Sequence, residues 1–129
     1  MNFERLKIEG KIDAWGIGLG EEEALISAIN YEKPPEAMQC AVNVMSSIGA
    51  IGYISRKPNP NKILTECQNK EIPILAIRAV QAGALTSKMD REPHPSGRDK
   101  ADFEDYEKAE VFRELSKDWG LSLIHISEP

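Results

Sequence analysis

Cysteines and long apolar runs are scarce in this sequence, and basic residues are outnumbered by acidic ones; each of these features excludes a class of protein. Only two cysteines, Cys40 and Cys67, occur among the 129 residues. They are too few for a disulfide framework, and neither belongs to the CxxC pair that is typical of zinc and thioredoxin-like sites. We therefore expect two buried, reduced cysteines and no metal site.

No segment is apolar over a length that could cross a membrane. A bilayer requires roughly 20 consecutive apolar residues, and the N-terminal segment MNFERLKIEG also lacks the apolar stretch of a signal peptide. The net charge of -5, from 16 basic and 21 acidic residues, argues against a general nucleic-acid binder, which gathers lysine and arginine on one face. We predict a cytoplasmic protein without membrane or nucleic-acid partners.

What the sequence does contain is an alternation of short apolar runs and amphipathic stretches, in a composition that is 41% apolar. This proportion suffices for one core of ordinary size. The apolar runs predict strands at residues 12–19, 38–44 and 72–77. The amphipathic stretches predict helices at residues 21–29, 62–70 and 106–119, and residues 89–102 are typical of a long loop. Such alternation predicts an α/β fold with a parallel sheet.

The third apolar run is followed by a loop of small residues. Residues 72–77 are apolar almost throughout, as expected of a strand buried on both faces of a parallel sheet. Ala82, Gly83 and Ala84 would let a ligand approach the backbone closely, while Arg78 and Lys88 place positive charge at the two ends of the loop. The pattern predicts a phosphate site. The alternative is an ordinary surface turn.

Two architectures fit this alternation. In a doubly wound nucleotide-binding fold, Gly16, Gly18 and Gly20 would form the phosphate loop between a strand and a helix. Their GxGxG spacing lacks the later glycine of the dinucleotide fingerprint, and the glutamates at 21–23 would repel a phosphate from the helix N-terminus. These departures favour the second architecture, a barrel of parallel strands.

Three segments, in the same order, resemble the aldo/keto reductases. GKIDAWGI at residues 10–17 is similar to the segment that opens the fifth barrel strand of that family, and MQCAVN at residues 38–43 is similar to its Gln-x-x-Tyr-Asn on the sixth. Residues 72–88 resemble the seventh strand and its pyrophosphate loop. The resemblance covers residues 6–120 and implies an α/β fold that is a partial (β/α)8 TIM barrel, since a complete barrel takes about 250 residues. The chain is therefore expected to be a fragment, about half of a barrel.

The resemblance implies an NAD(P)H-dependent oxidoreductase that transfers hydride to the carbonyl of a small aldehyde, ketone or sugar, with NADP favoured over NAD. It places the Gln39 amide on the nicotinamide carboxamide, with which that amide can exchange hydrogen bonds. A merely structural Gln39 would bond a neighbouring backbone instead. The other implied cofactor-binding residues surround the pyrophosphate or lie near it: Arg78, Ala79, Val80, Gly83, Leu85, Lys88 and Arg98. Asn43 is expected to shape a loop rather than to bind a ligand.

The resemblance also implies what this stretch does not carry. The catalytic Asp, Tyr, Lys and His of the family lie on its first four strands, so no catalytic residue is predicted here and the chain alone is expected to be inactive. Half a barrel would leave strand edges and apolar faces uncovered, which favours self-association. The alternative, from another class, is a small non-catalytic module that binds a nucleotide or a protein partner.

The C-terminal residues 121–129, LSLIHISEP, are the translation of CTGTCTCTTATACACATCTCCGAGCCC, which resembles a transposase adapter used in preparing sequencing libraries. We predict that residues 1–120 are the barrel fragment and that residues 121–129 are a non-native tail, in which His125 has no function. The alternative is a genuine strand over the same residues.

Overall fold

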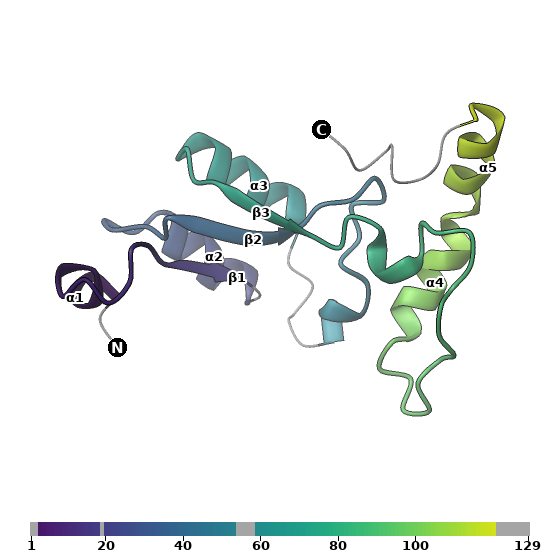
Figure 1. The fold of residues 1–129 in the computed structure, drawn as a ribbon, viewed down its shortest axis with the longest axis horizontal. Helices are drawn as coiled ribbons and strands as arrows, with labels where there is room; N and C mark the ends of the chain where they lie inside the picture. The colour runs from purple at the N-terminus through teal and green to yellow at the C-terminus, as the bar shows by residue number, and fades with distance from the viewer. Residues whose placement is uncertain (1–2, 19, 54–58, 121–129) are drawn as a thin grey trace.

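The computed structural model describes residues 3–18, 20–53 and 59–120. In Figure 1 the sheet lies toward one end of the molecule and α4 and α5 lie toward the other. The helices are α1 (Phe3–Ile8), α2 (Glu22–Ile29), α3 (Pro60–Asn69), α4 (Lys100–Lys108) and α5 (Glu110–Asp118); the strands are β1 (Gly16–Gly18), β2 (Ala37–Ala41) and β3 (Ile74–Ile77); the 3-10 helices are η1 (Gly49–Tyr53) and η2 (Gln81–Gly83). The predicted tail, residues 121–129, lies outside the described residues.

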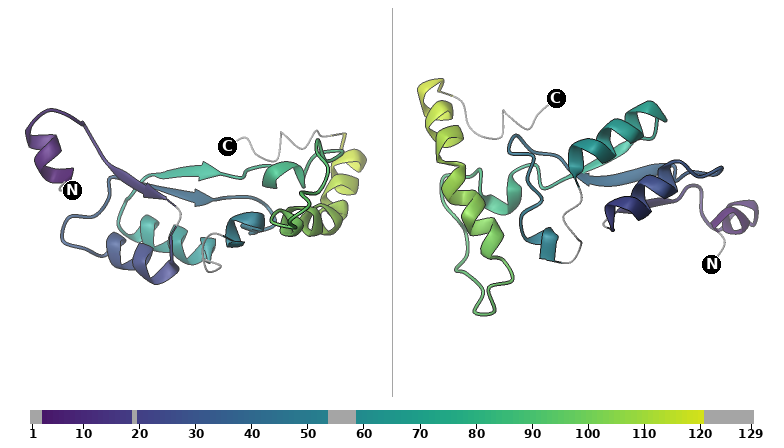
Figure 2. Two further views of the ribbon diagram at one scale, coloured as in Figure 1. Left: turned by 90° about the horizontal axis from the view of Figure 1, so that it is seen from below. Right: turned by 180° about the vertical axis from the view of Figure 1, so that it is seen from behind.

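The strands in the described part of the chain form one parallel sheet in the order β1-β2-β3. α2 connects β1 to β2, α3 connects β2 to β3, and both helices lie on the same face of the sheet (Figure 2). Neighbouring strands that follow chain order, with their crossover helices on one side, are typical of a (β/α)8 barrel, whereas a doubly wound fold has helices on both faces. The predicted α/β fold, a partial barrel, is confirmed.

The core lies between the sheet and these two helices. Met38 and Cys40 of β2 both face the helices, because alternate residues of a strand point to the same side, and they are 0% and 5% exposed. The buried core residues are Leu25, Ile29, Met38, Cys40, Ile63, Cys67 and Ile72. Both cysteines are buried and unpaired, as predicted. Burial raises the pKa of each thiol, which keeps both protonated and unreactive near neutral pH.

The opposite face of the sheet is open, which corrects the prediction that residues 72–77 form a strand buried on both faces. Leu75 is 62% exposed, and no helix within the described ranges covers its side of the sheet (Figure 2). The prediction was wrong because an apolar run only shows that a strand is suited to burial. Burial itself requires a second layer on that face.

Other element boundaries also differ from prediction. Pairing with β2 begins at Gly16, so β1 is shorter than the predicted strand at residues 12–19, and β2 ends before Asn43 folds the chain into a loop. The predicted helix at residues 106–119 is two helices, and α4 begins at Lys100, inside the predicted loop of residues 89–102. α4 packs against η1 and η2 rather than on the sheet. α1 was not predicted.

Glu22 joins the beginnings of α2 and α3. Its carboxylate accepts hydrogen bonds from Lys62 Nζ (2.7 Å) and from the backbone N–H of Asn59 (2.9 Å). These bonds, that of Lys62 first, hold the pKa of Glu22 below its ordinary value of 4.5. A carboxylate with a lower pKa in the folded state stabilises the fold above its unfolded pKa, and this contribution is lost as the pH falls through the folded pKa.

We therefore expect the Glu22→Gln variant to lose less stability than the parent chain between about pH 5 and about pH 3, as measured by urea unfolding. Glu32→Gln is the matched control, since Glu32 is exposed and forms no ion pair within the described ranges. This control should retain the acid dependence of the parent chain. An identical dependence in Glu22→Gln would contradict the role of the Glu22 bonds.

Candidate functional site

The candidate site lies where β2 and β3 end. Parallel strands bring their carboxyl ends to one edge of a sheet, and ligands of α/β proteins bind there. Beyond this edge the loop after β2, which contains η1, and the loop after β3, which contains η2, both meet α4 (Figure 1). The site is therefore built from three segments that are far apart in the sequence.

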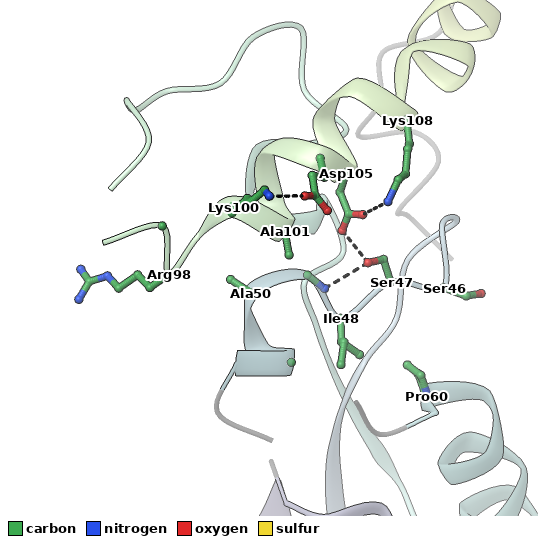
Figure 3. Close-up of a pocket in the computed structure, with 14 residues that line it drawn as sticks. Ser46, Ser47, Ile48, Ala50, Pro60, Arg98, Lys100, Ala101, Asp105 and Lys108 are labelled. Carbon is green, nitrogen blue, oxygen red and sulfur yellow. Dashed lines mark hydrogen bonds and ion pairs between the residues drawn. The ribbon is translucent and has the colours of Figure 1, made fainter. Parts of the chain in front are cut away.

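A cavity of about 520 Å³ lies between the loop after β2 and α4 (Figure 3). Its lining includes Ser46 and Ser47 on one side and Lys100, Asp105 and Lys108 of α4 on the other. Each lysine pairs with an acidic residue on its own helix. Lys100 Nζ lies 3.6 Å from Glu104 Oε1, and Lys108 Nζ lies 3.9 Å from Asp105 Oδ1. The charges around the cavity are thus largely balanced. Arg98 belongs to the same lining, but its side chain extends away from the other lining residues (Figure 3).

Buried polar side chains connect the three segments beside this cavity. We call Asn43, Arg78, Gln81, Asp102 and Asp105 the polar cluster. Gln81 is 0% exposed, and Asp102 and Asp105 are 4% and 6% exposed. The Gln81 amide donates to Asp105 Oδ2 (2.6 Å) and accepts from Arg78 Nε (2.9 Å) and from Asn43 Nδ2 (3.1 Å). Arg78 also forms an ion pair with Asp102.

The backbone of the loop after β3 has an unusual conformation. Arg78, Gln81 and Ala82 have φ values of 59°, 49° and 51°, and Gly83 has a φ of 95°. The left-handed region is unfavourable for residues with a Cβ, so only Gly83 adopts it without steric cost. The turn is closed by backbone hydrogen bonds from Gln81 N to Arg78 O (2.8 Å) and from Leu85 N to Val80 O (3.2 Å).

The structure brings most of the predicted pyrophosphate residues into this one turn: Arg78, Ala79, Val80, Gly83 and Leu85. The side chain of Leu85 is 4% exposed, so only its backbone could face a ligand. Lys88 follows the turn with an exposed side chain that pairs with no acidic group in the described part of the chain. Arg78 is different, because its side chain is only 14% exposed and its charge is paired with Asp102.

Gln39 lies on the open face of the sheet, in register with Gly18 on one side and Leu75 on the other. Its side chain extends over Gly18, where a Cβ would come within 2.6 Å of Gln39 Cβ and 2.8 Å of Gln39 Oε1. The glycine is therefore required for this placement. The Gln39 amide forms no hydrogen bond with other described residues, so its donor and acceptor groups remain available to a ligand.

Only part of the site could be predicted from the sequence. Asn43 was predicted to shape a loop, and it does: its Oδ1 accepts from the backbone N–H groups of Met45 and Ser47, each at 3.1 Å. The roles of Gln81, Asp102 and Asp105 were missed. The one available signal was the spacing of the two aspartates, which places them on one face of a helix. Their burial was not evident, because Asp102 ends the segment predicted as loop and Asp105 precedes the predicted helix.

The described residues thus form an α/β protein whose candidate site lies at the carboxyl ends of parallel strands. The sequence model of the Aldo/keto reductase family matches residues 1–127, which is nearly the whole chain. The chain belongs to the aldo/keto reductase family, an oxidoreductase family whose members generally depend on NAD(P). The match continues past Gly120 into the residues predicted to be a non-native tail, and the origin of that tail stays a prediction.

Comparisons with curated proteins and with solved structures gave no match. Every helix in the described ranges is too short or too polar to cross a bilayer. Within the same ranges, no group of three or more His, Cys, Asp or Glu side chains is placed to hold a metal ion.

Proposed function

We propose that this chain is the central-to-late barrel portion of an aldo/keto reductase and that it binds the pyridine nucleotide, NADP in preference to NAD. The observation that carries the proposal is the turn from Arg78 to Leu85, with its left-handed residues, near the same edge of the sheet as the half-buried amide of Gln39, which is unbonded among the described residues. A glycine in such a turn lets the backbone approach a diphosphate closely. Family membership favours this function over a non-catalytic binding module.

The predicted residues would bind different parts of the cofactor. The free amide of Gln39 would exchange hydrogen bonds with the nicotinamide carboxamide. The backbone of Ala79, Val80, Gly83 and Leu85 would surround the pyrophosphate, with the exposed Lys88 as its cation. Arg78 and Arg98 were predicted as further contacts; Arg78 is committed to Asp102 in this structure, and Arg98 extends away from the cavity.

The cofactor would supply a hydride to the carbonyl carbon of a small aldehyde, ketone or sugar. Reduction also requires a proton donor beside the carbonyl oxygen. The resemblance assigns that donor, with its Asp, Lys and His partners, to the first four strands of the family barrel. We therefore expect this chain to bind the nucleotide without reducing a carbonyl.

Replacing Gly83 with valine tests the proposal. A Cβ there would contact Met89 Sδ at 3.5 Å and Thr86 Oγ1 at 3.8 Å, and a β-branched residue is strained at a φ of 95°. The turn should therefore change shape, and the Kd for NADPH in a fluorescence titration should rise about tenfold or more. Gly10→Val is the matched control, because Gly10 also has a positive φ, of 65°, and a Cβ there would meet nothing within 4 Å. Equal Kd values for the two variants would refute the assignment of the turn.

A further inference from the structure

The geometry points to Gln81 and Asp105 as positioning residues: they fasten the loop after β3 to α4 and so hold it in its cofactor-binding conformation. The identity of the ligand rests on the proposed function, whereas the effect of the two residues on the loop does not. Gln81 is 0% exposed, so a cofactor cannot touch its side chain; Asp105 borders the cavity, but it is only 6% exposed and its Oδ2 is engaged by Gln81 and Ser47. Both would act through the backbone that they hold.

The loop requires such support because its backbone is strained. Three residues with a Cβ, Arg78, Gln81 and Ala82, have positive φ values. Such conformations persist only where the surrounding structure fixes them. Local turn hydrogen bonds close the loop, but they do not join it to another element. The polar cluster provides such a connection, beside the bonds that Arg113 Nη1 on α5 donates to Ala84 O (2.7 Å) and Arg91 Nη1 donates to Ala82 O (2.8 Å).

Gln81 forms hydrogen bonds through both the nitrogen and the oxygen of its side-chain amide. Its Nε2 donates to Asp105 Oδ2 on α4 at 2.6 Å, and its Oε1 accepts from Arg78 at 2.9 Å and from Asn43 at 3.1 Å. One side chain therefore links the loop after β3 to the loop after β2 and to α4. Losing one partner would leave a buried polar group unsatisfied, which costs more than the bond itself contributes.

Asp105 extends the same connection. Its Oδ2 also accepts from Ser47 Oγ at 2.5 Å, so the two side chains meet at the wall of the cavity (Figure 3). The Ser47 Oγ in turn accepts from the backbone N–H of Gly49 at 3.1 Å. One carboxylate thus holds both loops at the edge of the sheet where the strands end.

Arg78 belongs to this support. Its guanidinium pairs with Asp102, whose Oδ1 also accepts from the backbone N–H of Ala50 (2.8 Å) and whose Oδ2 pairs with Arg91 (3.1 Å). A buried charge keeps such partners because losing one is strongly unfavourable. The positive charge at the turn that remains exposed is that of Lys88.

Swapping the amide and the carboxylate between positions 81 and 105 tests the inference. Gln81→Glu places two carboxylates against each other, while the double variant Gln81→Glu/Asp105→Asn restores one donor and one acceptor in reversed order. Oε1 of the new glutamate can still accept from Arg78 and Asn43, and the Ser47 hydroxyl can accept from the new asparagine. Gln68→Glu, on the exposed surface of α3, is the matched control for the added charge.

Two quantities are measured at a pH of about 8, where carboxylates are ionised: hydrogen exchange of the backbone amides of residues 79–85 without nucleotide, and the Kd for NADPH. Gln81→Glu should accelerate exchange in these residues and raise the Kd about tenfold, as expected when a buried charge-assisted bond is lost. The double variant should reverse both changes. Gln68→Glu should alter neither, and exchange in α2 and α3 should stay unchanged throughout.

Failure to recover slow exchange in the double variant would overturn the inference, and so would unchanged exchange in Gln81→Glu. Accelerated exchange over the whole chain would also overturn it, because the pair would then stabilise the fold in general. If the parent chain binds no NADPH, the proposed function fails separately, and the recovery of slow exchange alone decides whether the pair fastens the loop.

Discussion

The Gly49→Val variant is expected to lose about 2 to 5 kcal/mol of its free energy of unfolding, the sum of left-handed backbone strain and of overpacking. Gly49 has a φ of 49°, and a Cβ at this position would lie 2.5 Å from Arg78 Nη2 and 2.7 Å from Gln81 Nε2, besides meeting Asp102. No side chain fits there unless the polar cluster separates. The Kd for NADPH should rise together with the loss of stability.

Gly97→Val separates the two causes. Gly97 also has a positive φ, of 68°, but a Cβ there would meet nothing within 4 Å. This variant should show the backbone strain alone, about 1 to 2 kcal/mol, in urea unfolding. If Gly49→Val were no more destabilising than Gly97→Val, this result would contradict the close packing of the loop after β2 on the polar cluster.

The second large effect concerns the two faces of the sheet. Met38→Ala should cost about 2 to 5 kcal/mol of the free energy of unfolding, because a buried side chain leaves a cavity. Leu75→Ala, on the neighbouring strand, should cost less than about 0.5 kcal/mol. The register pairs Met38 with Ile74, so Met38 and Leu75 lie on opposite faces, and they are 0% and 62% exposed. Urea unfolding of both variants measures the difference.

The same pair of variants tests whether the chain associates with itself. Self-association stays a proposal; it would cover the open face that carries Leu75. In that case Leu75→Ala would cost nearly as much as Met38→Ala, and stability would depend on protein concentration. Sedimentation of the parent chain and of Leu75→Ala at several concentrations distinguishes an exposed face from one covered by another copy.

Much of the fold follows from local sequence patterns. α2 begins with acidic residues and continues with Leu25 and Ile29 one turn apart, so its apolar face is already evident in the sequence. α3 starts slightly before its predicted limit because the Asn59 side chain accepts from the backbone N–H of Lys62 (3.3 Å) and Pro60 occupies the first turn. Gly120, with a φ of 63°, follows the end of α5, which agrees with the predicted helix end at residue 119.

The site was less predictable because polar burial has no periodic signal. Asp102 and Asp105 occur in or beside a stretch rich in proline, glycine and charge, which favours a loop. They are buried in a helix because Arg78, Arg91, Gln81 and Ser47 reach them from other segments. Arg78 illustrates the same difficulty, since its position beside a small-residue loop suggested a phosphate contact, whereas the structure pairs it with an aspartate 24 residues away in the sequence.

The sequence by itself determined the order of strands and helices, the glycine turn after β3 and the family to which those segments are similar, because each depends on neighbours along the chain. Only the tertiary structure decided which face of the sheet is covered and which charges are neutralised inside. Those outcomes depend on contacts between segments far apart in the sequence, as in the ion pair of Arg78 and Asp102 and the bond of Gln81 to Asp105. Low exposure to water makes such contacts obligatory once they form.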